Sequence, residues 1–175
     1  MKSSEFYDFI STRSSVRIFS GNPVSDEEIE FIIKCASRAP SAGNRESWDV
    51  VVVKDESIKE DLFDAAFSQE HIKSAPVVLA VCANYIRSMS QYGERGILYA
   101  VEDASIAATY MMLAAHSLNL HTCWTGAFDD ETVSEILGLM QHARPVALLA
   151  VGHGSLPEFR TERMPVGEHI HEDTW

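Results

Sequence analysis

Runs of consecutive apolar residues predict where the strands of this chain lie. Three such runs, at residues 50–53, 77–82 and 145–151, are short and apolar at every position, as is typical of strands that are buried on both faces. Residues 121–127, which are less uniformly apolar, predict a further short strand. Because helical patterns alternate with these runs, we expect a layered α/β (α+β) protein whose sheet is mixed or antiparallel.

Capping residues mark the helices that we expect between the strands. Ser25 and Glu28 form a capping box ahead of an amphipathic helix, which we expect to end near Pro40. Residues 6–12 predict a short helix at the start of the chain. Two more helices are expected to begin at Asp55 or Ser57 and at Asp129 or Asp130.

The longest helical candidate covers residues 97–120. Its alanines and methionines give apolar surface almost all round, which predicts a long buried central helix. Small residues on such a helix allow close packing within one subunit or between two. Asn119 is expected to end the helix in a left-handed conformation.

Two segments show no helical or strand period. Residues 84–96 are polar, and we expect a mobile connection there that could act as a lid over a site. After Ser155 the chain contains two prolines and no periodic pattern, so we expect an extended tail that frays or lies across another surface. Neither a repeat nor a boundary is visible, and we predict a single domain over residues 1–175.

The charge of the chain limits the partners that it can bind. With 26 acidic and 14 basic residues its net charge is −12, which argues against nucleic acid or an anionic membrane as a partner. An anionic ligand would need a local basic pocket. The chain has no apolar stretch of 18 residues and no signal-like start, so we expect a cytoplasmic protein without a membrane span. Cys35, Cys82 and Cys123 are expected to be buried thiols in a reducing compartment.

Several kinds of active site find no support in the sequence. His169 and His171 lie in a tail with few suitable partners, so we assign no metal. The Gly152-His153-Gly154 stretch lacks the third glycine of a dinucleotide fingerprint, and no Gly-x-Ser-x-Gly motif occurs. Isolated histidines such as His116 and His142 are more often structural residues than general bases.

A cluster of anion-binding groups follows the first predicted helix. In Arg13-Ser14-Ser15-Val16-Arg17 two guanidiniums lie four residues apart with two hydroxyls between them, a set that suits a phosphate and a second electron-rich edge. If this stretch is extended, Arg13, Ser15 and Arg17 share one side of the chain. The alternative is an ordinary polar turn with two solvated arginines.

Three further polar stretches lie at the ends of apolar elements. They are Pro40-Ser41-Ala42-Gly43-Asn44 with Trp48, Trp124-Thr125-Gly126-Ala127, and Arg163 in the tail. In this order and spacing, and together with the Arg13–Arg17 cluster and the alanine-rich helix, they resemble the FMN-dependent nitroreductase family. The resemblance runs from about residue 6 to residue 165. It implies a three-layer fold, with a central, mostly antiparallel sheet flanked by helices.

The resemblance also implies roles for individual residues. Arg13 and Arg163 would meet the flavin phosphate, Arg17 would lie at the pyrimidine end of the ring, and Ser15 would bond between them. Asn44 would approach the pyrimidine atoms, partly from a partner subunit, and backbone amides near Thr125 and Gly126 would face the reactive N5. The cofactor-binding residues implied in this way are Arg13, Ser14, Ser15, Arg17, Pro40, Ser41, Ala42, Asn44, Thr125, Gly126 and Arg163.

The activity that the resemblance implies is hydride transfer. NADH or NADPH would reduce the flavin, and an electron-poor small molecule such as a nitroarene or quinone would then be reduced. The flavin carries the chemistry, so no catalytic side chain is expected beyond it. A homodimer with both flavins at the interface is also implied. Alternatives that stay open are a reductase of an enone, a halogenated aromatic or free flavin, a low-turnover flavin-binding module, and an interaction protein without cofactor.

One stretch departs from the family pattern. Where the family often has Asn-x-Gln-Pro-Trp, this chain has Asn44-Arg45-Glu46-Ser47-Trp48. A carboxylate thus replaces an amide, and a proline is absent. If Glu46 points at the flavin its charge would oppose the reduced ring, whereas a solvent-facing Glu46 would change nothing.

Overall fold

A four-stranded sheet forms the middle layer of the computed structural model, which describes residues 2–159 and 161–175. Its strands are β1 (Trp48–Val53), β2 (Val77–Asn84), β3 (His121–Thr125) and β4 (Ala143–Gly152). Their order across the sheet is β1-β2-β4-β3, and each neighbouring pair is antiparallel. The predicted mostly antiparallel sheet is therefore confirmed.

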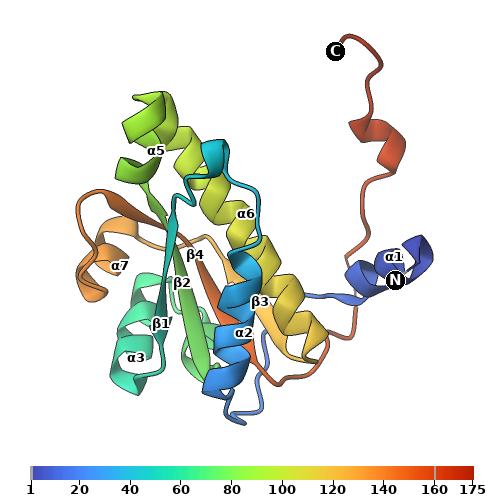
Figure 1. The fold of residues 1–175 in the computed structure, drawn as a ribbon. Helices are drawn as coiled ribbons and strands as arrows, with labels where there is room; N and C mark the ends of the chain where they lie inside the picture. The colour runs from blue at the N-terminus through green and yellow to red at the C-terminus, as the bar shows by residue number, and fades with distance from the viewer. Residues whose placement is uncertain (1, 160) are drawn as a thin grey trace.

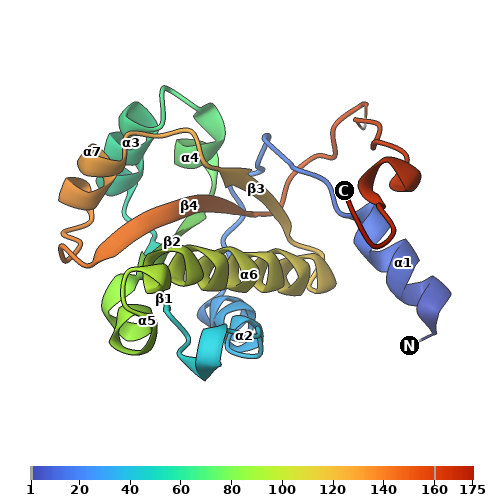
Figure 2. The ribbon, with the colours of Figure 1, turned by 90° about the horizontal axis from the view of Figure 1, so that it is seen from above.

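Helices cover both faces of this sheet, as Figures 1 and 2 show. On one face lie α2 (Asp26–Ala36), α5 (Tyr85–Tyr92) and the long α6 (Arg95–Ser117). On the other lie α3 (Glu56–Ala65), α4 (Glu70–Ser74) and α7 (Asp130–Ile136). The strand side chains alternate between the two layers: Leu79 and Val81 pack toward α2 and α6, whereas Val78 and Ala80 pack toward α3 and α7. This is the predicted three-layer fold.

Local capping explains several element boundaries. The Ser25–Glu28 capping box starts α2, Asp55 caps α3 and Asp129 caps α7, each as predicted. Asn119, with φ +59°, follows α6 in the left-handed conformation that was expected of it. However, α2 ends at Ala36 and not near Pro40.

The central helix α6 is confirmed as a core element. Nine of its residues are buried, most of them alanines, which lets it lie close to the sheet and to α2. By length and hydropathy alone α6 would also qualify as a membrane span. Its packing between the sheet and α2 is that of a core helix.

The prediction of an unstructured connection at residues 84–96 is wrong, because this segment forms α5 and the start of α6. The side chain of Asn84 accepts a hydrogen bond from the Arg87 backbone and starts α5, and Gly93, with φ +56°, ends it. The apolar pattern misses this helix because its fully buried residue is Ser88, while Ile86 is exposed. The short helix α4 also carried no predicted pattern.

Close packing explains the two glycines of the Gly152-His153-Gly154 stretch. A Cβ atom at Gly152 would lie 2.5 Å from a Pro76 ring carbon, and one at Gly154 would lie 2.3 Å from the Ile18 carbonyl oxygen. Both glycines are therefore required for close packing of the chain against the end of β4. Of the thiols, Cys82 and Cys123 are buried as predicted, whereas Cys35 is only half-buried.

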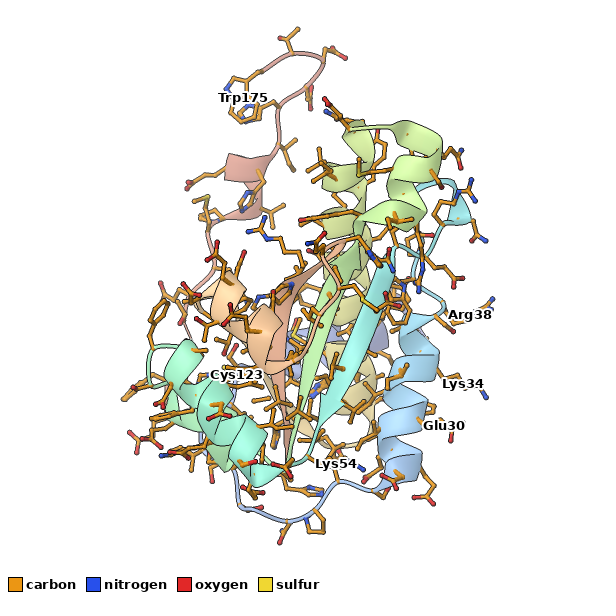
Figure 3. All side chains as sticks on the ribbon, turned by 90° about the vertical axis from the view of Figure 1, so that its left-hand side faces the viewer. Glu30, Lys34, Arg38, Lys54, Cys123 and Trp175 are labelled. Atoms are coloured by element: carbon orange, nitrogen blue, oxygen red, sulfur yellow. The ribbon has the colours of Figure 1, made fainter. Side chains whose placement is uncertain are left out.

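The two ends of the chain extend away from these layers on the same side (Figures 1 and 2). They are α1 (Ser3–Thr12) and the segment after β4, whose only regular element among the described residues is the short 3-10 helix Val166–His169. Trp175 lies at the far end of this tail, fully exposed (Figure 3). Phe159, Val166 and Ile170 are exposed along it.

Candidate functional site

The arginine-rich stretch is held against the sheet by backbone bonds. Arg13 follows α1 in extended conformation, Ser15 forms a parallel bridge with Thr122, and the Val16 amide donates to the Thr122 carbonyl at 3.0 Å. Val16 is fully buried, whereas Arg17 and Ile18 are exposed. The stretch runs alongside the start of β3 and continues to the segment after β4, where Phe19 forms an antiparallel bridge with Gly154.

Arg13 and Arg17 lie near the buried thiol of Cys123, and Arg163 lies near Arg13. Burial lowers the pKa of Arg13, and the positive charge of Arg163 lowers it further. Burial raises the pKa of the Cys123 thiol, and the nearby Arg17 and Arg13 oppose that rise. Figure 3 marks the position of Cys123 in β3.

In the described part of the chain, Arg13, Arg17 and Arg163 make no ion pair, although the protein carries a net charge of −12. Like charges that face one another repel, and a bound anion relieves the repulsion. The cluster therefore suits a bound anion, and the binding roles expected of these arginines stay predictions.

A second candidate stretch forms a tight turn between α2 and β1. It contains the 3-10 helix Ala42–Asn44. The carboxylate of Asp103, a buried residue of α6, accepts the backbone amide of Ala42 at 2.9 Å and that of Ser47 at 3.2 Å. The Ser41 hydroxyl accepts the Glu46 amide at 3.0 Å. One buried carboxylate thus holds both ends of this turn.

Helix α5 braces the same turn from outside. Arg87 donates to the carbonyls of Glu46 and Trp48, at 2.9 and 2.8 Å, and pairs with the Asp49 carboxylate at 2.6 Å. Arg45 donates to the Gln91 side chain at 2.8 Å. Helix α5 therefore supports residues 41–48, and whether it also acts as a lid stays a prediction.

This geometry explains why position 47 holds serine and not the proline of the family pattern. A proline has no amide hydrogen, so only a residue such as Ser47 can donate from position 47 to Asp103. The Ser47 hydroxyl is buried, and among the described residues it has no hydrogen-bond partner. Glu46 is exposed and has a positive φ of 47°.

The arginine-rich stretch and the turn at residues 41–48 do not meet within one chain. The turn is anchored at Asp103, whereas α1 contacts the other end of α6, where the rings of Phe9 and His116 lie 4.9 Å apart. Thirteen residues of helix separate Asp103 from His116, which corresponds to about 20 Å at 1.5 Å per residue. Figure 1 shows α1 and α5 at opposite ends of α6.

The third stretch continues from β3 past Thr125, which is buried, to the exposed Gly126 and Ala127. The Oγ1 atom of Thr125 lies 2.6 Å from Nε2 of the buried His71. Burial lowers the pKa of His71, and the charge of Arg17 lowers it further. Arg17 and the end of β3 therefore belong to the same neighbourhood.

Two of the residues that organise this region, His71 and Asp103, were not predicted from the sequence. His71 lies in a helix that showed no pattern, and nothing in the sequence marks it. Asp103 interrupts an otherwise small and apolar helix face, and a carboxylate there needs buried donors. That mismatch was the one available signal.

An antiparallel sheet with a buried central helix defines an α+β protein, and a group of arginines that make no ion pair with the described residues lies beside its edge strand β3. Residues 10–72 and 65–153 match the model described as the Nitroreductase family. The chain belongs to the nitroreductase family, and the predicted family and fold are confirmed.

Individual relatives agree with this assignment. The chain is 30% identical over 182 residues to a protein of Thermus thermophilus named NADH dehydrogenase, with 88% of this chain and 89% of the relative covered. It is 27% identical over 175 residues to a Bacillus subtilis protein named FMN reductase (NADPH), with 92% and 70% covered. Among solved structures, NfrA1 of B. megaterium superimposes with a TM-score of 0.91 at 26% identity, covering 98% of this chain and 75% of that one.

Proposed function

We propose that this protein binds FMN and is an NAD(P)H-dependent oxidoreductase that reduces electron-poor small molecules such as nitroaromatics or quinones. The observation that carries the proposal is the group of three arginines without carboxylate partners, Arg13, Arg17 and Arg163. The names of the relatives support the flavin and the nicotinamide. When bound, FMN would accept a hydride from the nicotinamide and pass it to the acceptor.

The residues of the chain would divide the work of binding and tuning. Arg13 and Arg163, which sense each other's charge, suit a phosphate. The charge of Arg17 acts on His71, which contacts Thr125 at the end of β3, and a fixed charge there would stabilise electron density on the ring without any reorganisation at the moment of reaction. The exposed backbone of Gly126 offers an amide hydrogen at the same strand end.

We further propose that the working unit is a homodimer. The turn that contains Ala42 and Asn44 is anchored at Asp103, which lies about 20 Å along α6 from His116, where the helix before Arg13 packs, so a second copy is the simplest way to bring the two groups to one cofactor. The tail and α1 expose apolar side chains, Tyr7, Val166 and Trp175 among them. β1 is an edge strand, and a groove of about 510 Å³ lined by Val51, Val53 and Leu137 adjoins it. The tail of a partner would cover such surface. A cytoplasmic location is part of the same proposal.

The test of the flavin proposal begins with the purified protein. Bound oxidised flavin absorbs near ~450 nm, and anaerobic addition of NADH or NADPH should bleach that band before an acceptor panel restores it. A yellow protein that neither nicotinamide bleaches would be a flavin-binding module. A protein that binds no FMN at any concentration tested would refute the proposal.

The dimer is tested by sedimentation velocity over a dilution series, with and without FMN. Truncation after Ser155 removes Arg163 and the tail, so both dimer affinity and flavin content should fall. The variant Arg163→Ala should lose flavin affinity but remain dimeric at high protein concentration. A monomer with full flavin content would contradict the shared site.

Free flavin is the second candidate substrate. The Bacillus subtilis relative is named FMN reductase (NADPH), which favours this alternative among the acceptors. An acceptor panel that contains free FMN as well as nitroaromatics distinguishes the two.

A further inference from the structure

The segment after β3 is fastened at two points to residues around the start of α4. The Gln69 side chain donates through Nε2 to the Ala127 carbonyl at 2.8 Å and to the Ala66 carbonyl at 2.9 Å. Two residues further on, Nε2 of His71 lies 2.6 Å from the Thr125 hydroxyl. The two fastenings flank Gly126, one on each side. We call this arrangement the α4 clamp.

The clamp holds a residue that would otherwise be free to turn. Gly126 has no side chain to restrict its backbone, and glycine samples more conformations than any other residue. Its surroundings add little, because a Cβ there would meet only the Trp124 ring, at 3.3 Å. The orientation of the Gly126 amide therefore depends on its neighbours Thr125 and Ala127, whose hydroxyl and carbonyl are held by His71 and Gln69.

The clamp is built from buried polar side chains, although apolar side chains would be sufficient if the only role of these positions were packing. His71 and Thr125 are 4% and 2% exposed, and burying such groups costs free energy that their mutual bond offsets only in part. Arg17 adds to the cost of protonating His71, since its charge and the burial both lower the pKa of the imidazole. The neutral imidazole of His71, a residue of α4, thus connects that helix to the segment that contains the exposed Gly126.

We propose that Gln69 and His71 are positioning residues of the cofactor site. They hold the Thr125–Ala127 backbone so that the Gly126 amide is already aimed at the reactive edge of the flavin ring before the flavin binds. This inference rests on the proposed function. A preset amide dipole acts on charge that develops during hydride transfer, so the clamp governs reactivity, whereas the arginines govern affinity.

The test compares variants that open the clamp with variants that keep it. Thr125→Val and Gln69→Leu each remove one fastening with little change in shape. His71→Leu removes the imidazole, while His71→Gln keeps an amide group near the position of Nε2. The chain offers a matched control in its second histidine–threonine contact, between Thr12 Oγ1 and His116 Nε2 at 2.9 Å; Thr12→Val deletes the same hydroxyl elsewhere.

The first measurement needs no cofactor. Backbone order at Gly126, measured by 15N relaxation of the flavin-free protein, should fall in Thr125→Val and Gln69→Leu, because each variant removes one of the bonds that restrain the neighbouring residues. Backbone order in Thr12→Val should match the wild type. Equal Gly126 backbone order in all variants would overturn the clamp, whatever the protein binds.

The second measurement uses flavin-loaded protein in stopped flow with NADH. The rate constant for flavin reduction should fall by about tenfold to a hundredfold when the clamp is opened, because a misplaced group near the reacting atoms lowers the rate by that order. The flavin Kd should change less than about threefold. His71→Gln should recover most of the rate. Unchanged rate constants in variants that fold and bind flavin would overturn the inference.

Wild-type protein that binds no flavin would instead refute the proposed function. If His71→Leu does not fold, Gln69→Leu decides, since Gln69 is only half-buried.

Discussion

Replacing Asp103 by asparagine tests how the turn at residues 41–47 is held. The carboxylate accepts two backbone amides, from Ala42 and Ser47. Asparagine keeps one acceptor oxygen and turns an NH2 group toward the other amide, so one bond is lost and a buried donor stays unsatisfied. A hydrogen bond to a charged group is worth about 1.5–3 kcal/mol. For a protein of this size that corresponds to a fall in Tm of about 3–12 °C.

Thermal unfolding followed by circular dichroism measures this fall, and flavin titration measures the effect on the site. The matched control is Glu102→Gln, which makes the same chemical change at the neighbouring, exposed position of α6 and should leave Tm within about 1 °C. We expect Asp103→Asn to weaken flavin binding as well as stability. An unchanged Tm would show that the Asp103 bonds do not hold the turn. A lower Tm with unchanged flavin affinity would remove the turn from the cofactor site.

Three further predictions concern single residues. Arg17→Ala should weaken flavin binding about tenfold to 150-fold, from ~1.5–3 kcal/mol, and lower the flavin reduction potential; Lys34→Ala, on the exposed side of α2, should do neither, and equal behaviour of the two variants would exclude Arg17 from the site. Because the fold lowers the pKa of His71, its neutral form adds stability that is present above the ordinary histidine pKa of about 6.5 and is lost as the pH falls below it. Thermal melts at about pH 7.5 and 5.5 should therefore show a smaller loss for His71→Gln than for the wild type, and equal losses would contradict this reading. Gly43→Ala places a side chain at φ +56° and a Cβ 2.4 Å from the Tyr92 hydroxyl, which should cost about 1–2 kcal/mol and lower Tm by roughly 2–8 °C; an unchanged Tm would mean that the turn rearranges freely.

The apolar runs predicted the sheet well because its strands are sandwiched between helices. Strand β2 is buried at every position, so its sequence carries an unmistakable signal. Helix α5 carries none, since it buries Ser88 and exposes Ile86. Its packing is set by α6 and the adjoining turn, that is, by tertiary contacts that no local period records.

The candidate site was predictable where residue chemistry is unusual and not where ordinary residues are placed by the fold. Arg13 and Arg17 are conspicuous in an acidic chain, and the structure brings them together with Arg163. His71 contributes only through its proximity to Thr125, which lies 54 residues away in sequence. Whether Asn44 reaches the same cofactor stays a prediction, because that depends on a second copy of the chain.

The bonds from Asp103, Arg87 and Arg45 have a thermodynamic consequence for ligand binding. They hold the turn at residues 41–47 in one conformation within the protein itself. Ordering one residue of backbone costs about 1–2 kcal/mol, and for this turn that entropy is lost when the chain folds. A ligand that docks on it therefore meets a rigid surface, and more of the contact free energy appears as measured affinity.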